Sequence, residues 1–154
     1  MNPNTKLFEI KQLGKENLSI FKLLIDLFNM VFEEESMVGE NGNLLKLLGS
    51  HSFIAIAAVS ENEVVGGLTA YELPMVYSKS SEIFLYDLAV KPEYQRMGIG
   101  KRLIQSLKEY CVKNGIKEFF VLAHEEDKHA VEFYRAIGGK SEKVVNFLYE
   151  AGEE

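Results

Sequence analysis

The stretch DLAVKPEYQRMGIGK, residues 87–101, decides how the chain can fold. An apolar run ends at Val90, a short loop containing Pro92 follows, and Gly98 and Gly100 open a pattern typical of an amphipathic helix. Glycines let a backbone approach a ligand without intervening side chains. The first N–H groups of a helix have no intrahelical partners and lie at its positive end. The stretch therefore predicts a binding site for a pyrophosphate.

Glycine spacing distinguishes the nucleotide-binding motifs that bind phosphate through glycines and the first N–H groups of a helix. A Walker A loop requires G-x-x-x-x-G-K-[ST], and no glycine stands at the right offset before Gly100. The dinucleotide fingerprint G-x-G-x-x-G lacks its third glycine, because Leu103 occupies that position. The pattern that remains is Q/R-x-x-G-x-G/A, which begins at Gln95.

This pattern resembles the acetyl-CoA motif of the GNAT superfamily of N-acetyltransferases, as do YDLAVKPEYQ (residues 86–95) and AVEFYRAIGG (residues 130–139). The resemblance implies the α/β GNAT fold, with a mixed, mostly antiparallel central sheet flanked by helices in one domain, residues 1–154. It also implies acetyl-CoA as the co-substrate. The residues it assigns to the coenzyme are Leu88, Ala89, Val90, Gln95, Arg96, Met97, Gly98, Ile99, Gly100, Lys101 and Ala130.

Hydropathy patterning along the rest of the chain predicts the order β-α-α-β-β-β-α-β-α-β. Helices are expected where apolar residues recur at three- and four-residue spacing, and strands where they alternate or form short runs. The expected strands are 6–12, 52–59, 64–71, 82–90, 117–123 and 144–149. The expected helices are 15–32, 44–48, 98–114 and 127–137, with a turn at 41–43 and Asp127 as an N-cap.

A tyrosine stands in the motif A-x-x-x-Y-x-x-x-G, which runs from Ala130 to Gly138. In the family that this motif resembles, the tyrosine hydroxyl points at the coenzyme sulfur, which implies a catalytic role for Tyr134. Amine attack on a thioester expels a thiolate, and a neutral phenol can protonate it. The alternative is that Tyr134 is a packing aromatic on an amphipathic helix.

From about residue 18 to residue 149 the chain is also similar to the small aminoglycoside 3-N-acetyltransferases. The stretches that match are LIDLF (24–28), SFIAIAAV (52–59), VVGGLTAYELP (64–74) and SEIFLYDLAV (81–90). This resemblance implies a cationic acceptor, whose ammonium groups need acceptors or counter-charges. The candidate acceptor-binding residues are Glu34, Glu35, Tyr86, Asp87 and Asp127. Asp87 or Glu82 is the candidate proton acceptor for the attacking amine.

Two segments depart from the aminoglycoside pattern and leave the acceptor open. The similar enzymes tend to carry an acidic pair and a proline before the final helix, where this chain has Asp127, Lys128 and His129. Residues 36–43 are also hard to match. A GNAT enzyme for a polyamine, a peptide N-terminus or a protein lysine is one alternative. A non-catalytic acetyl-CoA-binding module is another, against which Tyr134 and the acidic strand residues argue.

Composition excludes some partners. Seventeen Lys and Arg against 23 Asp and Glu give a net charge of −6, so nucleic acid is not expected as a partner. An acidic surface attracts cationic small molecules. The longest apolar run, residues 53–59, is too short to span a bilayer, and no secretory signal is visible, so we expect a soluble cytoplasmic protein. A homodimer is expected by analogy with similar enzymes.

Neither a metal nor a covalent intermediate is expected. His124 and His129 resemble H-E-x-x-H but stand at i, i+5, which rotates them apart on a helix. The single cysteine, Cys111, falls on an apolar helix face and has no activating neighbour in the sequence. Acetyl transfer is therefore predicted to run directly from thioester to amine.

Overall fold

The computed structural model describes residues 7–34 and 39–152, which divide into two compact units, one up to Leu122 and one from Ala123. The second unit holds α4 (Lys128–Ala136). The first holds, in order, β1 (Glu9–Gln12), the 3-10 helix η1 (Lys15–Asn17), α1 (Leu18–Val31), α2 (Asn41–Leu48), β2 (Phe53–Ser60), β3 (Glu63–Pro74), β4 (Ser81–Val90), the 3-10 helix η2 (Pro92–Tyr94), α3 (Ile99–Lys113) and β5 (Phe119–Val121).

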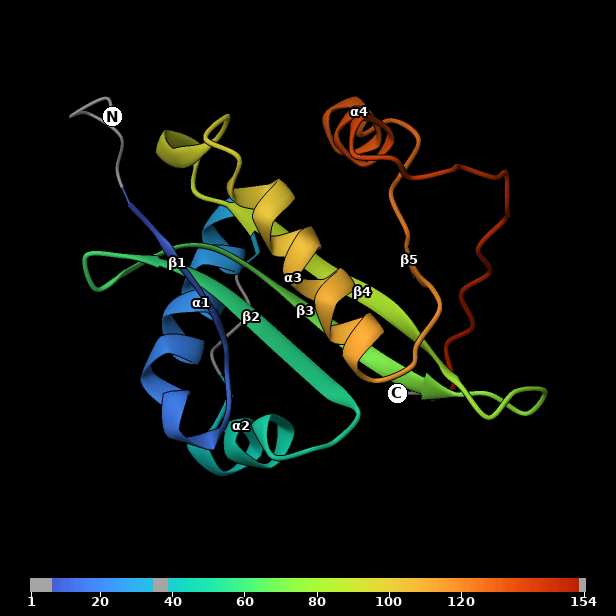
Figure 1. Ribbon diagram of the computed structural model, residues 1–154, viewed down its shortest axis with the longest axis horizontal. Coiled ribbons are helices and arrows are strands. Elements are labelled where there is room, and N and C mark those ends of the chain that lie inside the picture. Colours follow the sequence, from blue (N-terminus) through green and yellow to red (C-terminus); the bar gives the residue numbers. More distant parts are fainter. Residues whose placement is uncertain (1–6, 35–38, 153–154) are drawn as a thin grey trace. The chain divides into compact units, whose positions relative to one another are not determined.

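The five strands form one open sheet in the order β1-β2-β3-β4-β5 (Figure 1). The first three pairings are antiparallel, and β5 pairs in parallel with β4. The parallel pairing follows from chain direction, because α3 carries the chain back along the sheet before β5 begins. The predicted mixed, mostly antiparallel sheet flanked by helices is confirmed.

Two adjacent glycines on β3 show which helix covers which face of the sheet. A Cβ at Gly67 would clash with a methyl carbon of Leu24 on α1, and one at Gly66 would stand 3.0 Å from Ile99 on α3. Successive residues of a strand face opposite sides of a sheet, so α1 and α3 pack on opposite faces. Glycine is needed at position 67 because a Cβ there would also lie 2.8 Å from the carbonyl oxygen of Ile56 on β2, a main-chain atom that cannot move aside as a leucine methyl can.

The core on the α1 face is a continuous apolar cluster. It joins Phe21, Leu24, Leu27 and Phe28 of α1 to Phe53, Ala55 and Ala57 of β2, together with Leu44 and Leu48 of α2. On the opposite face, α3 buries Ile99, Leu103, Ile104, Leu107 and Cys111. In the described part of the chain, no helix combines the length and the apolar character that crossing a membrane requires.

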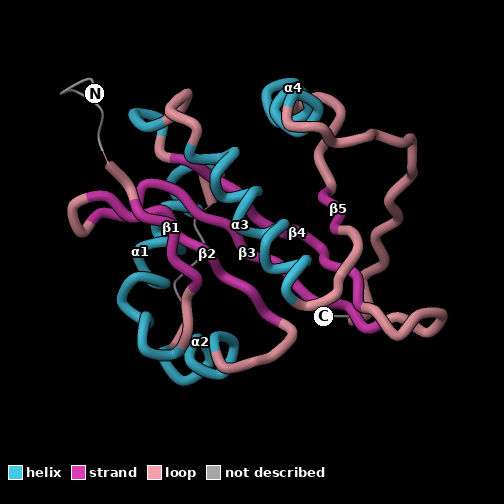
Figure 2. The backbone as a smooth tube through the Cα atoms, in the orientation of Figure 1, coloured by secondary structure: helices cyan, strands magenta, loops and turns pink. Residues whose placement is uncertain are grey.

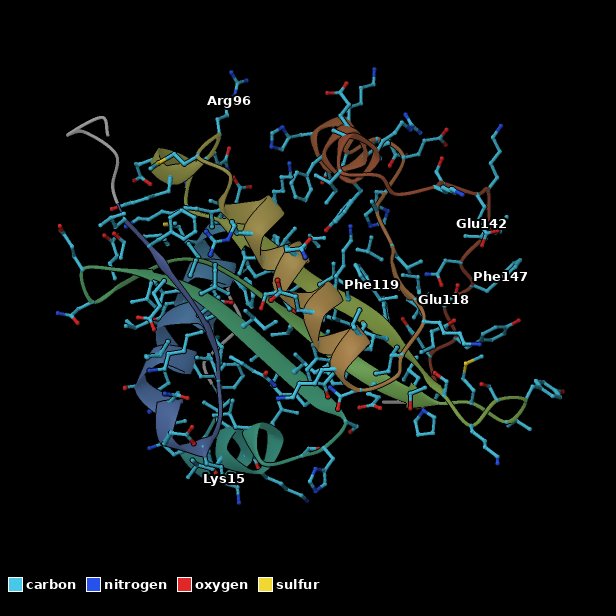
Figure 3. All side chains as sticks on the ribbon, in the orientation of Figure 1. Lys15, Arg96, Glu118, Phe119, Glu142 and Phe147 are labelled. Carbon is cyan, nitrogen blue, oxygen red and sulfur yellow. The ribbon has the colours of Figure 1, made fainter. Side chains whose placement is uncertain are left out.

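One predicted strand is wrong. Residues 144–149 form no strand, and in Figure 2 this segment runs as loop. Its apolar side chains are exposed, including Phe147 at 74% (Figure 3). Residues with a high β propensity form a stable strand only where a neighbouring strand pairs with them. The local sequence does not reveal whether such a neighbour exists.

Other boundaries move by a few residues. Helix α2 already begins at Asn41, so the predicted turn at 41–43 is its first turn. Strand β5 covers only Phe119–Val121 instead of 117–123. Strand β3 continues to Pro74, because it keeps pairing with β4 as far as Ser81. Element boundaries are the least reliable part of a sequence-based prediction.

Candidate active site

A β-bulge on β4 positions the predicted acceptor residues. Thr69 of β3 pairs with Asp87, but its neighbour Ala70 pairs with Leu85, so the register passes over Tyr86. Such an extra residue re-aims side chains, and it lets two consecutive residues share one face of a sheet. The Tyr86 ring contacts Tyr71 of β3 at 5.7 Å between ring centroids, on the face that holds Asp87 and Thr69.

Asp87 is a half-buried carboxylate with a defined hydrogen-bond donor. The Thr69 hydroxyl donates to its Oδ2 at 2.5 Å. Burial raises the pKa of Asp87 above its ordinary value, and the Thr69 hydrogen bond acts in the opposite direction. A carboxylate with a raised pKa is a better proton acceptor than an ordinary surface carboxylate. The structure thus shows Asp87 as a half-buried carboxylate with a raised pKa and one hydrogen-bond donor.

Tyr71 belongs to the same group, although the sequence analysis did not single it out. Burial raises the pKa of Tyr71, and the nearby charge of Asp87 and the Tyr86 phenol raise it further. Its hydroxyl therefore stays protonated at neutral pH. The signal in the sequence was the pair Thr69 and Tyr71, two polar-tipped residues that share one face of the strand.

The second candidate base, Glu82, lies elsewhere on β4. It pairs with Leu73 and stands five residues before Asp87. Strands rise about 3.3 Å per residue, so the two carboxylates are on the order of 15 Å apart along the strand. They share the α1 face but are too far apart to act on one amine together.

The loop after β4 holds the backbone in the shape expected of an anion-binding turn. Arg96 has a φ of 63° and Gly98 a φ of 81°. The loop is tied to the sheet, because Gln95 Nε2 donates to Val90 O at 3.1 Å and Lys91 N donates to Val65 O at 2.8 Å. Helix α3 then starts at Ile99 directly after the left-handed glycine.

The first turn of α3 is open to a ligand. Gly98 is its N-cap and has no side chain to accept a hydrogen bond from the first amides. The first hydrogen bond to the Gly98 carbonyl comes from Arg102 N, at 3.0 Å, which leaves the N–H groups of residues 99–101 without a helical partner. These amides and the helix dipole fit a pyrophosphate.

Three cationic side chains around this turn, those of Arg96, Lys101 and Arg102, are exposed, and one of them contacts an aromatic ring. Arg96 and Lys101 are exposed, and Figure 3 shows the Arg96 side chain extending away from the loop. The Arg102 guanidinium lies 5.5 Å from the centroid of the Phe8 ring, so a cation–π contact holds it.

The other residues predicted to contact the coenzyme differ in the exposure of their side chains and in whether their main-chain N–H groups are free. Ala89 is 5% exposed and packs in the core under α1, so only its main chain can reach a ligand. Leu88 and Val90 are half-buried, whereas Met97 is exposed. Within the second unit, Ala130 N donates to Asp127 Oδ1 at 3.1 Å, so that amide is already used.

That hydrogen bond confirms Asp127 as the N-cap of α4. Farther along this helix, burial and, to a lesser degree, the charge of Asp127 raise the pKa of Tyr134 to about 12. The Tyr134 ring packs edge-to-face against Phe133 at 5.2 Å. Tyr134 is therefore a neutral phenol throughout the physiological range, as a general acid for a thiolate must be.

The remaining acidic candidates are less defined. Glu34 is exposed beyond the end of α1, where its N–H donates to Asn29 O at 3.0 Å. It lies three residues beyond the last residue of α1, after the positive φ of Glu33. Glu35 lies outside the described residues. No group of three His, Cys, Asp or Glu side chains that could hold a metal occurs in the part of the chain that the structure describes.

Solved structures with the same architecture include aminoglycoside acetyltransferases. One from an uncultured soil metagenomic sample, in complex with trehalose, is 37% identical to this chain with a TM-score of 0.92, covering 99% of this chain and 100% of that one. The same enzyme in complex with sisomicin is also 37% identical, with a TM-score of 0.91, covering 94% and 97%.

Curated relatives match over shorter stretches. A thialysine N-epsilon-acetyltransferase of Sus scrofa is 34% identical over 38% of this chain, and the match spans about a third (34%) of that relative's length. A ribosomal protein bS18 alanine N-acetyltransferase of Escherichia coli (strain K12) is 27% identical over 47% of this chain and 48% of its own length.

The family comparison extends over most of the chain. The model of the Acetyltransferase (GNAT) family matches residues 18–138, which include the β4 bulge, the open first turn of α3 and Tyr134. Enzymes of this family transfer an acetyl group from acetyl-CoA. With that match and the fold described above, the chain belongs to the GNAT family of N-acetyltransferases.

Proposed function

We propose that the chain transfers acetyl from acetyl-CoA to a primary amine of a small cationic acceptor, with an aminoglycoside acetylated at its 3-amino group as the leading case. The observation that carries this proposal is the Asp87 carboxylate, which the β4 bulge holds beside Tyr71 and Tyr86 with a raised pKa. The similarity to an acetyltransferase solved with sisomicin supports the aminoglycoside.

Asp87 would take the proton from the acceptor. An ammonium ion has no lone pair, so the amine must lose a proton before its nitrogen can attack the acetyl carbon. Because burial raises the pKa of Asp87, the proton transfer from an ammonium is less unfavourable than transfer to an ordinary surface carboxylate. The negative charge also stabilises the ammonium before reaction, so we expect proton removal to accompany acceptor docking or to pass through a water molecule.

Tyr134 would give its proton to the leaving sulfur. As the new C–N bond forms, the C–S bond breaks and its electrons stay on sulfur. With a pKa of about 12, Tyr134 is a weaker acid than a simple thiol, whose pKa is about 8.5. Full proton transfer to the thiolate is thus unfavourable both before and after bond cleavage. The phenol would stabilise the negative charge that develops on sulfur by donating a hydrogen bond, and any proton that it passes on would be replaced by the proton that the amine releases.

The open turn before α3 would hold the coenzyme. The N–H groups from Arg96 to Lys101 are the donors for its pyrophosphate, and the left-handed Gly98 keeps this approach clear of side chains. The main chain of residues 88–90, at the end of β4, would align the thioester next to Asp87. The tie between Gln95 and Val90 links the two segments.

A second acceptor class has its own support. The curated relatives are named for the side-chain amine of thialysine and for the alanine of a ribosomal protein. Lys128 and His129, which follow Asp127, also differ from the acidic pair expected for an aminoglycoside. A polyamine, a peptide N-terminus or a protein lysine is therefore the alternative acceptor, and the coenzyme residues would be the same.

The deciding experiment is an acetyl-CoA consumption assay with sisomicin, spermidine, thialysine and a short peptide that begins with alanine. We expect turnover with sisomicin, and a KM that rises with salt as the partly exposed charges are screened. Turnover on spermidine, thialysine or the peptide without turnover on sisomicin would assign the chain to the alternative, and a KM that ignores salt would point to the peptide. Coenzyme binding with no turnover on any amine would identify a non-catalytic module. Sedimentation of the same sample would test the expected homodimer.

A further inference from the structure

Four aromatic side chains form a straight row across the α1 face of the sheet. Phe53, Tyr71, Phe84 and Phe120 are direct register partners on β2, β3, β4 and β5. Their ring centroids are 5.4 Å apart from Phe53 to Tyr71, and 4.8 Å apart from Phe84 to Phe120, where the rings are nearly parallel. Tyr86 stands against both middle rings, 5.7 Å from Tyr71 and 5.3 Å from Phe84.

The row emerges from the core toward solvent. Phe53 is 9% exposed, because Phe21 of α1 packs edge-on against it at 5.7 Å. Farther along, Phe120 is 36% exposed and Tyr86 is 61% exposed. We name the emergent part, Tyr71, Phe84, Tyr86 and Phe120, the aromatic shelf. Tyr71 and Phe84, between these two ends, are half-buried. A partly exposed aromatic surface of this kind is typical of a binding site.

Two carboxylates flank the aromatic shelf. Along β4 the side chains on the α1 face follow the order Glu82, Phe84, Tyr86, Asp87, because strand residues alternate and the bulge returns Tyr86 to this face. The rings thus lie between two negative charges that are on the order of 15 Å apart. That spacing suits a molecule with two ammonium groups at its ends and an apolar or sugar body between them.

We propose that the aromatic shelf, with Glu82 and Asp87, is the acceptor-binding surface and that it selects elongated polycations over monoamines. Asp87 faces the ammonium that reacts, Glu82 pairs with a distant one, and the rings stack under the body of the acceptor. This assignment rests on the proposed function, and it makes Glu82 a specificity residue rather than a base. Tyr71, Phe84 and Phe120 become acceptor contacts alongside the predicted Tyr86.

The chemistry of the occupant follows from the sign of the charges. Aromatic ring faces are partly negative and attract cations, and both flanking side chains are acids. A cationic acceptor therefore complements every part of the surface, whereas a neutral or acidic peptide would face unpaired carboxylates. A second copy of this chain, with its own net charge of −6, would also meet like charge there.

The experiment compares sisomicin with cyclohexylamine, a ring that carries one amine, as substrates for the variants Glu82→Gln and Tyr86→Ala. The matched control is Glu72→Gln, which removes the same charge from the α3 face, where Glu72 accepts a 3.4 Å hydrogen bond from Tyr110. A charged hydrogen bond is worth about 1.5–3 kcal/mol, so Glu82→Gln should raise the sisomicin KM by roughly ten-fold or more.

The kcat for sisomicin and the cyclohexylamine KM should stay unchanged in Glu82→Gln, because the distant ammonium does not react. A cation–π contact at an exposed site contributes about 0.5–1 kcal/mol, so Tyr86→Ala should raise the sisomicin KM by about 2–5-fold. Tyr86→Phe should have a sisomicin KM close to that of wild type, since the ring and not the hydroxyl makes this contact. Glu72→Gln should leave both KM values unchanged.

Calorimetric titration of sisomicin into the protein without coenzyme separates this proposal from the proposed function. Binding that weakens in Glu82→Gln and Tyr86→Ala supports the shelf even if no amine is acetylated. Equal effects on both amines, or full sisomicin affinity in both variants, would overturn the shelf even if sisomicin is acetylated. A change in sedimentation coefficient with unchanged sisomicin affinity would also overturn it, because the shelf would then be an interface between copies.

Discussion

Thr69 donates its hydroxyl hydrogen to Asp87 across the β3–β4 register, at 2.5 Å and beside the residue where that register shifts. The hydrogen bond stabilises the charged carboxylate and so lowers a pKa that burial raises. In the proposed mechanism Thr69 would act on the amine through Asp87, as a positioning residue.

Thr69→Val keeps the shape of the side chain and removes the donor. The pKa of Asp87 should rise, and the acidic limb of the pH–rate profile should move to higher pH because Asp87 must be deprotonated to accept a proton. One lost hydrogen bond of about 0.5–1.5 kcal/mol implies a plateau rate lower by about 2–10-fold. Thr69→Ser, which keeps the hydroxyl, should leave the limb in place. An acidic limb that is identical in all three proteins would contradict the role of Thr69.

Asp87→Asn separates activity from stability. A carboxyl whose pKa is higher in the folded than in the unfolded state destabilises the fold as pH rises through the window between the two values, and this penalty is complete above the folded-state pKa. Asparagine carries no charge and still accepts the Thr69 hydrogen bond. We expect kcat to fall by about 10²–10⁴, while the midpoint of thermal unfolding at pH 7 is equal to or above that of wild type. A lower midpoint at pH 7 would show that the charge stabilises the fold.

Tyr134→Phe tests the leaving-group acid. The ring still packs against Phe133, so acetyl-CoA affinity should be unchanged, whereas kcat should fall by about 10²–10⁴. The matched control is Tyr149→Phe, which removes the hydroxyl of an exposed tyrosine in the same unit and should have no effect.

The pH dependence gives a second check on Tyr134. With a pKa of about 12, its phenol keeps its proton well above neutral pH. An unperturbed tyrosine titrates at about 10, so an alkaline limb of the wild-type pH–rate profile near pH 9 or 10 would not come from Tyr134. Such a limb should therefore persist in Tyr134→Phe. Disappearance of such a limb in the variant would mean that the phenol titrates at its ordinary value.

Periodicity predicted most of the fold because it reports burial. The apolar spacing in residues 15–32 and 98–114 located α1 and α3, and the glycine pattern at 98–100 located the open turn between β4 and α3. Strand 144–149 was wrong, because pairing depends on a neighbour distant in sequence.

The site was less predictable for the same reason. Asp87 and Tyr86 were found through a resemblance, but Tyr71 was not, since the bulge that groups the three is a property of the β3–β4 register and not of either strand alone. Register also puts Glu82 and Asp87 on one face yet far apart, which their closeness in sequence concealed. The hydrogen bond from Ala130 N to Asp127 is local, and the expected N-cap could have signalled that this amide was not free.

Two left-handed glycines stand at the ends of α3. Gly98 precedes the helix with a φ of 81°, and Gly115 follows it with a φ of 69°. A Cβ at either position would meet no described atom within 4 Å. Alanine in this conformation costs about 1–2 kcal/mol, so Gly98→Ala and Gly115→Ala should lose similar amounts of stability.

Only Gly98→Ala should weaken coenzyme binding, because only Gly98 shapes the turn whose N–H groups would hold the pyrophosphate. Relaxation of the strained backbone would rotate those amides away from their common target. Calorimetry with CoA should show an affinity lower by at least about an order of magnitude, equivalent to about 1.4 kcal/mol, while Gly115→Ala binds as wild type. Equal CoA affinity in the two variants would place the pyrophosphate elsewhere, and an equal loss in both would point to general destabilisation of α3 instead.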